Sequence, residues 1–247
     1  MADEITVTKS VADIVVKHPE TRKLLEVIGI DYCCGGKHGL NEACESAGLS
    51  PQDVVQKLKE VVESSEKERS NKIKLDEISL EELIDHIISE HHAFLKEELP
   101  RLKNLREKVY RTHQQKHGSM LENLGRSFEK LRIDIEMHLA KEEQILFPAI
   151  EKIENHFRQG GPKPEIHCGS ITNPISQMEY EHEVAGGLLA EMQKTTSGYN
   201  PPSEACESFK ALYDGLWELE DNLHEHIHLE NNILFPKAVK LEEEMGV

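Results

Sequence analysis

The sequence predicts an all-α protein, in which a four-helix bundle follows a small helical domain. Three observations lead to this prediction. The 247 residues contain 38% hydrophobic and 30% charged residues, with the supply of Glu, Lys and Leu that helices favour. Helix-start signals introduce four long amphipathic stretches after residue 76. An eleven-residue motif occurs twice within these stretches, at an offset of 88 residues.

Residues 1–66 are expected to form the small helical domain. Pro19 is predicted at the first position of one helix, and Ser50 and Pro51 at the N-cap and first position of another. About 60 residues is marginal for independent stability, so we expect this domain to lean on the rest of the chain or on a second subunit, as in a homodimer. The polar residues 67–76 are expected to be a linker.

Residues 77–247 are expected to form the bundle. Its four helices have predicted starts at Ser79 with Glu82, at Ser119 with Glu122, at Asn173–Pro174, and at Ser203. Apolar spacing continues past Pro100, so this proline should kink the first helix rather than begin a new one.

The repeated motif reads "HLAKEEQILFP" at 138–148 and "HIHLENNILFP" at 226–236, and six of the eleven positions are identical. The constant offset indicates two helical hairpins related by an approximate two-fold axis. Each copy places a histidine and a glutamate four residues apart. On a helix, two such residues are rotated by about 40° from each other around the axis and share one face. The apolar residues predicted on the same faces are Leu131, Ile135 and Ile145 in one copy, and Leu219, Leu223 and Ile233 in the other.

The two His–Glu pairs, His138 with Glu142 and His226 with Glu230, should therefore point into the core. Burying these groups unpaired would cost several kcal/mol each, whereas a metal ion uses both as ligands. Two such pairs suggest two metals that share two carboxylates. Nitrogen and oxygen ligands with open positions favour iron or manganese over structural zinc.

The first and third helices must supply further ligands. His182 is the inward candidate on the third helix. On the first helix, periodicity alone does not separate His91 from His92.

Four other histidines are interpreted as surface residues. His224 and His228 lie about 200° round the helix from His226 and should face outward. His113 and His117, which share the same H-x-x-x-H spacing, are interpreted as a solvated face.

The two motif copies and the N-terminal "IDYCCGG" together resemble the Repair of Iron Centres family, hemerythrin-like di-iron proteins with a cysteine-bearing N-terminal domain. The resemblance covers nearly the whole chain. It implies a hemerythrin-like four-helix bundle with two iron ions per chain, bridged by the glutamates and by oxo or hydroxo groups. The implied ligands, with His92 chosen over His91, are His92, His138, Glu142, His182, His226 and Glu230.

Oxygen-carrying hemerythrins resemble this bundle but usually supply a second histidine one turn later on the third helix. That position here is Gly186, which should leave an iron more open to a small molecule. Two adjacent glycines inside a helix cost up to about 1 kcal/mol each, so Gly186–Gly187 marks either close packing or a path to the metals.

The five cysteines include an adjacent pair, Cys33 and Cys34. Adjacent cysteines rarely form a disulfide with each other, and we expect reduced thiols throughout. Residue chemistry alone favours a buried structural pair, although a nearby helix N-terminus would lower the thiol pKa. The family resemblance implies instead that the pair binds or relays iron or nitric oxide. Cys44, Cys168 and Cys206 are interpreted as ordinary residues.

The formal charge of −17 argues against nucleic acid, because phosphate binding needs clustered Lys and Arg. We see no apolar run long enough to span a membrane and no secretion signal, so a cytoplasmic protein is expected. The resemblance implies repair of iron–sulfur proteins damaged by nitric oxide or peroxide, through iron donation. The alternatives are an enzyme that reduces nitric oxide, a module that senses or carries dioxygen or nitric oxide, and a bundle without metal.

Overall fold

The computed structural model describes residues 5–33, 35–65, 75–160, 163–166 and 169–245. Within these ranges the ordered elements are helices, and the only strand-like pairing is an isolated bridge between Ser10 and Gly39. The predicted all-α class is confirmed.

The described part of residues 5–65 contains five short helices. They are α1 (Val11–Lys17), the 3-10 helix η2 (Pro19–Thr21), α2 (Arg22–Val27), α3 (Leu40–Ser46) and α4 (Pro51–Ser65). Ser10 caps α1 by accepting a hydrogen bond from the Asp13 amide at 3.0 Å. Ser50 stands at the predicted N-cap of α4, with the Asp53 amide 3.4 Å from its hydroxyl.

Buried apolar side chains of these helices form one core, which also includes Ile227 from the C-terminal part of the chain. Residues 1–83 group with residues 227–237 in one compact unit, and residues 84–226 with 238–247 in the other. The small domain thus packs with residues 227–237 of its own chain. The boundaries expected from the sequence, 1–66, 67–76 and 77–247, stay a prediction, and residues 66–74 of the expected linker lie outside the described residues.

The first bundle helix contains α5 (Leu80–His86), the π-helical segment η3 (Ile87–His92) and the start of α6 (Ala93–Lys141). The capping box predicted at its start is present. Glu82 accepts a hydrogen bond from the Ser79 amide at 2.9 Å, and the Ser79 hydroxyl accepts one from the Glu82 amide at 3.1 Å.

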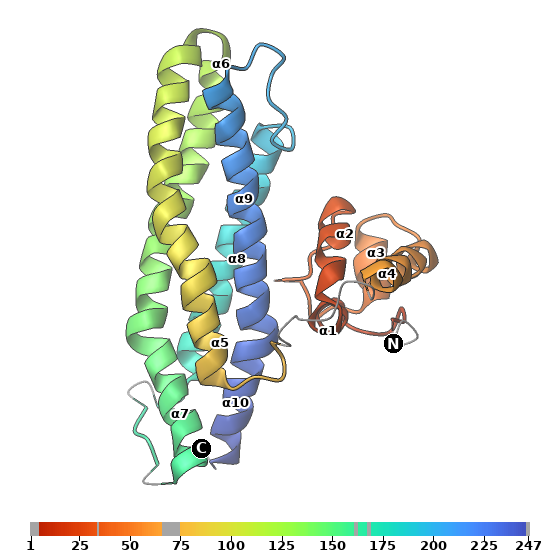
Figure 1. Cartoon of the computed structure of the whole chain (residues 1–247), viewed down its shortest axis with the longest axis vertical. Helices are drawn as coiled ribbons and strands as arrows, with labels where there is room; N and C mark the ends of the chain where they lie inside the picture. Colours follow the sequence, from red (N-terminus) through yellow and green to blue (C-terminus); the bar gives the residue numbers. More distant parts are fainter. Residues whose placement is uncertain (1–4, 34, 66–74, 161–162, 167–168, 246–247) are drawn as a thin grey trace. The chain divides into compact units, whose positions relative to one another are not determined.

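The 49-residue run α6 folds back on itself. His117 has non-helical backbone angles, φ −122° and ψ 16°. Residues at similar distances on either side of it contact each other: Tyr110 donates to Glu122 at 2.7 Å, and Lys96 pairs with Glu143 at 2.6 Å. α6 therefore supplies parts of two antiparallel bundle helices, as the yellow and green ribbons of Figure 1 show.

Two expectations about this run need correction. The helix was expected to start again at Ser119, but helical geometry resumes directly after His117. The expected partner Glu122 instead accepts the hydroxyl of Tyr110 across the reversal. Pro100 lies inside the helix, as expected, and the residue with non-helical angles is His117.

The second helix continues through the π-helical segment η4 (Glu142–Leu146) into α7 (Phe147–Gln159). The third is α8 (Thr172–Thr195), which begins beside the predicted Asn173. The fourth contains α9 (Glu207–Leu229), the π-helical segment η5 (Glu230–Leu234) and α10 (Phe235–Glu244). It begins four residues later than the predicted Ser203. These long helices form the predicted four-helix bundle (Figure 1).

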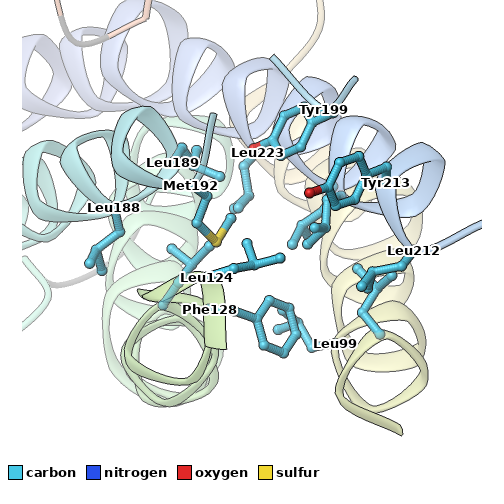
Figure 2. Close-up of a cluster of buried hydrophobic side chains, with 14 of the residues drawn as sticks. Leu99, Leu124, Phe128, Leu188, Leu189, Met192, Tyr199, Leu212, Tyr213 and Leu223 are labelled. Atoms are coloured by element: carbon cyan, nitrogen blue, oxygen red, sulfur yellow. The ribbon is translucent and has the colours of Figure 1, made fainter. Parts of the chain in front are cut away.

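A large apolar cluster fills the bundle towards the α6 reversal. Side chains from α6, α8 and α9 interdigitate there, as Figure 2 shows for Leu124, Met192 and Tyr213. Such packing fixes the helix spacing, so polar residues further along the same faces are held in defined positions. Among the described helices, none has both the length and the apolar character of a membrane span.

Candidate metal centre

Six buried polar side chains line the interior of the bundle beyond this apolar cluster. Each is at most 1% exposed. They come from all four long helices: His92 from η3, His138 from α6, Glu142 from η4, His182 from α8, His226 from α9, and Glu230 from η5. The structure therefore brings together every residue that the sequence proposed as a metal ligand.

The π-helical segments coincide with these residues. His92 ends η3, while Glu142 and Glu230 begin η4 and η5. A π turn carries one more residue than an α turn and rotates the residues inside it, which is why such turns are frequent at functional sites. Ile145, expected to face the core, is consequently 54% exposed, and Leu146 is buried in its place.

The carboxylate of Glu142 lies at the meeting point of three imidazoles. Its Oε1 atom is 3.1 Å from Nε2 of His138. Its Oε2 atom is 3.4 Å from Nε2 of His92 and 3.8 Å from Nε2 of His226. The two oxygens thus face different histidines, as a bridging carboxylate requires.

The potential ligand atoms form two groups, within each of which all atoms lie within 4.8 Å of one another. The first donor group is His92, Glu142, His226 and Glu230. The second donor group is His138, Glu142, His182 and Glu230. Both glutamates belong to both groups.

This donor set fits bound cations. Two carboxylates without a countercharge would be costly in a buried site, and a cation offsets that cost. Imidazole nitrogen and carboxylate oxygen without thiolate suit iron. Nε2 of His138 and Nε2 of His182 are 3.1 Å apart, a separation that two ligands of one metal ion can adopt.

Two outer carboxylates orient the histidines. Nδ1 of His92 lies 2.7 Å from Glu143, which also pairs with Lys96. Because the carboxylate can only accept, the imidazole donates from Nδ1 and directs Nε2 into the bundle. The same tautomer follows for His138, whose Nδ1 lies 3.0 Å from Glu181.

Both outer carboxylates stay ionised at neutral pH. The hydrogen bond from His138, together with those from Lys141 and Gln177, lowers the pKa of Glu181 to about 2 although partial burial opposes the shift. Burial also opposes ionisation of Glu143, but hydrogen bonds from Lys96 and His92 lower its pKa overall.

His91 is buried next to His92 but belongs to neither donor group. Its ring stacks on that of His226, with centroids 5.9 Å apart and an interplanar angle of 14°. Burial, assisted by the nearby His226, lowers the pKa of His91 to about 4, so this imidazole is neutral at pH 7.

Gly186 is half-buried on α8, one turn after His182. Among the described residues, no heavy atom outside its own helix lies within 4 Å of a Cβ built at Gly186 or at Gly187. Close packing therefore does not explain this glycine pair.

Comparisons with known proteins agree with this geometry. Residues 83–238 match the Hemerythrin HHE cation binding domain, and residues 7–62 match a Domain of Unknown function (DUF542). The chain is 36% identical over 228 residues to an Iron-sulfur cluster repair protein YtfE of Enterobacter sp. (strain 638), covering 92% of this chain and 94% of that protein.

This chain belongs to the hemerythrin-like family of iron–sulfur cluster repair proteins. A further relative, a Probable iron-sulfur cluster repair protein of Haemophilus influenzae, is 35% identical over 231 residues, which are 94% of this chain and 96% of that protein. The predicted family is therefore confirmed. All six buried ligand candidates lie in the hemerythrin match, and Cys33 and Cys34 lie in the other.

In this member of the family, Cys33 is buried. Its thiol donates to Asp31 at 3.2 Å, and the Cys33 amide donates to the same carboxylate oxygen at 2.9 Å. The next helix, α3, begins at Leu40. Cys34 lies outside the described residues.

His228 corrects another expectation. It is buried rather than outward-facing, and its Nδ1 atom lies 3.4 Å from the carbonyl oxygen of Tyr32. Asn232 donates to the carbonyls of Tyr32 and Cys33, each at 3.3 Å. The segment 227–237 therefore holds the backbone of the cysteine motif, a role for which the sequence offered no signal. His224 is half-buried.

The remaining cysteines are in different surroundings. Cys44 is buried in the N-terminal core, and burial raises the pKa of its thiol. Cys206 is exposed. Cys168 lies outside the described residues.

Proposed function

We propose that this protein repairs iron–sulfur clusters damaged by nitrosative or oxidative stress, and that it does so by supplying iron. The observation that carries the proposal is the pair of buried donor groups that share Glu142 and Glu230. Relatives that this chain matches over nearly their whole length are named iron–sulfur cluster repair proteins, which supports the same function.

The proposal includes two iron ions per chain, one in each donor group. Bound iron would supply redox chemistry and is also the cargo that leaves. Glu142, whose two oxygens face different histidines, would bridge the two positions. Glu143 and Glu181 keep Nε2 of His92 and His138 directed inwards.

Cys33 and Cys34 are proposed to relay iron or nitric oxide between the donor groups and an outside acceptor. The hydrogen bonds from Asn232 support this role for Cys33, because they join the cysteine motif to the helical segment that also carries Glu230. The acceptors are iron–sulfur proteins that have lost or damaged their clusters. A cytoplasmic location belongs to the same proposal.

The deciding experiment follows iron. Protein purified without air is analysed for metal, and Mössbauer spectra are recorded before and after addition of an apo iron–sulfur acceptor. We expect two coupled irons at the start, and transfer of iron together with recovery of acceptor activity. A centre that keeps all its iron while the acceptor stays inactive would contradict the proposal.

Replacing both Cys33 and Cys34 with Ser tests the relay separately. The double variant should keep its di-iron spectrum, since the donor groups contain no cysteine, but it should lose much of its repair activity. Undiminished repair would contradict the relay and would indicate that the two cysteines have a structural role.

The open space at Gly186 favours one rival, an enzyme that reduces nitric oxide at the same centre. A Gly186→Ala variant adds a methyl group that meets no neighbour within 4 Å, so folding and iron content should be unchanged. Slower reaction with nitric oxide in this variant would identify the entry path. Repeated formation of nitrous oxide without iron loss would favour the enzyme over repair, whereas reversible dioxygen binding without iron loss would favour a carrier.

A further inference from the structure

Two sequence features without a role in the iron centre meet at the α6 reversal. His113 and His117 share one face of the helical turn that ends there, and Cys206 lies just before α9. About 90 residues of the chain separate the two histidines from Cys206. The two histidines are half-buried, so the face on which they were expected is only partly solvated.

Four potential metal ligands lie in two contacting pairs. Nε2 of His113 is 3.2 Å from Sγ of Cys206. Nε2 of His117 is 3.4 Å from Oε1 of Glu204, and this nitrogen is shielded from solvent without a hydrogen-bond partner.

A fully buried phenylalanine forms the floor of this cluster. The Phe209 ring meets the His113 ring edge-on with centroids 5.1 Å apart, and the His117 ring with centroids 5.9 Å apart. These contacts limit the rotation of both imidazoles and leave their Nε2 atoms directed at the turn that precedes α9.

The separations within each pair agree with tetrahedral zinc. From typical zinc–ligand lengths, a nitrogen and a sulfur on one ion are roughly 3.6 Å apart, and a nitrogen and an oxygen roughly 3.4 Å apart. The observed pairs, at 3.2 and 3.4 Å, are already close to these values. The two imidazole centroids are 6.5 Å apart. Two imidazoles on one ion keep them roughly 5 Å apart. No three of these four described side chains offer ligand atoms that all lie within 4.8 Å of one another, so binding requires these partly exposed side chains to close around the ion.

We propose that this end of the bundle binds one zinc-like divalent cation, separately from the iron centre. Its ligands are His113, His117, Glu204 and Cys206. Two neutral imidazoles, one thiolate and one carboxylate would neutralise the dication, with release of the thiol proton on binding. Lys116, now 3.9 Å from Glu204, would give up that weak contact. The ion would fasten the first helical hairpin to the turn that precedes the fourth helix.

The test uses the full-length, iron-loaded protein and Co2+ as a spectroscopic substitute for zinc. Cobalt bound to a thiolate gives a charge-transfer absorption that a purely nitrogen and oxygen site cannot give. We expect this absorption with one Co2+ per chain, its displacement by Zn2+, and protection of Cys206 from alkylation. The variants Cys206→Ser, His113→Asn and His117→Asn should each weaken binding by about tenfold or more.

Two controls separate this site from others. The Cys33→Ser/Cys34→Ser variant should keep the absorption, which excludes the adjacent cysteines. His38→Asn, which alters an exposed His–Glu pair with Glu42 at 3.1 Å, should leave binding unchanged. The iron spectrum and helicity show that each variant is folded. The proposal is overturned if the absorption is absent, if it survives Cys206→Ser, or if neither His113→Asn nor His117→Asn weakens binding.

Discussion

The two copies of the eleven-residue motif, 138–148 and 226–236, place identical ligand types at equivalent positions but differ on their outer faces. Ile145 is 54% exposed in the first copy, whereas its counterpart Ile233 is 5% exposed in the second. Ile145 lies in η4 and Ile233 in η5, and in the second copy α1 packs against η5.

The polar positions differ in the same way. Ala140 and exposed Gln144 in the first copy correspond to His228 and Asn232 in the second, which contact the backbone of the cysteine motif. The comparison teaches that the inner face of a repeat can keep one chemistry while its outer face acquires a second role.

The largest effect should come from the position at which the copies agree. Glu142→Ala and Glu230→Ala each remove a carboxylate that belongs to both donor groups. Each variant should therefore lose iron or the magnetic coupling between irons, as measured by metal analysis and Mössbauer spectroscopy. Glu136→Ala, which removes only an exposed pairing with Arg132, is the control. If either test variant kept two coupled irons, the glutamate replaced in it would not be a shared ligand, and the two copies would not be equivalent.

The isoleucine pair should show the difference between the copies in stability. Ile233→Ala empties a buried site and should cost about 2–5 kcal/mol. Ile145→Ala, on an exposed side chain, should change the free energy of unfolding by less than about 0.5 kcal/mol. Urea denaturation of the two variants measures both values. Equal losses would show that the outer faces do not differ as described.

A smaller effect is expected for the polar residues Asn232 and Gln144, which occupy equivalent positions in the two copies. Asn232→Ala removes the amide that donates to the carbonyls of Tyr32 and Cys33. Because both bonds are long, we expect a local cost of about 1 kcal/mol, seen as faster amide exchange around residue 33. Gln144→Ala should leave exchange unchanged throughout the chain, and matching effects in the two variants would count against the contact.

The smallest effect concerns iron content in two histidine variants. His224→Ala and His228→Ala alter side chains that lie outside both donor groups, so each should retain the same iron as the unchanged protein. Metal analysis decides this. Iron loss in either variant would mean that the set of ligands is incomplete.

Local signals predicted much of the fold and the inner face of the site. The Ser79–Glu82 capping box and the repeated His–Glu spacing depend on residues within a few positions of each other, so the sequence contains them directly. The clustering of His138 and His182 then follows once the apolar stripes of the helices face one another, whereas only the family resemblance separated His92 from His91.

Other features depend on contacts that no short stretch contains. A π turn has no strong residue preference, so Ile145 was assigned to the core from regular helical spacing. The burial of His228 depends on a segment almost 200 residues earlier in the chain. His113 and Cys206 likewise meet only through the tertiary fold.

The matching π turns also limit changes in chain length. The segments 142–146 and 230–234 occupy the same place in both copies, 88 residues apart. Each begins with a glutamate that belongs to both donor groups. Deleting one residue from either segment would therefore change the rotation between that carboxylate and the apolar residues that follow it.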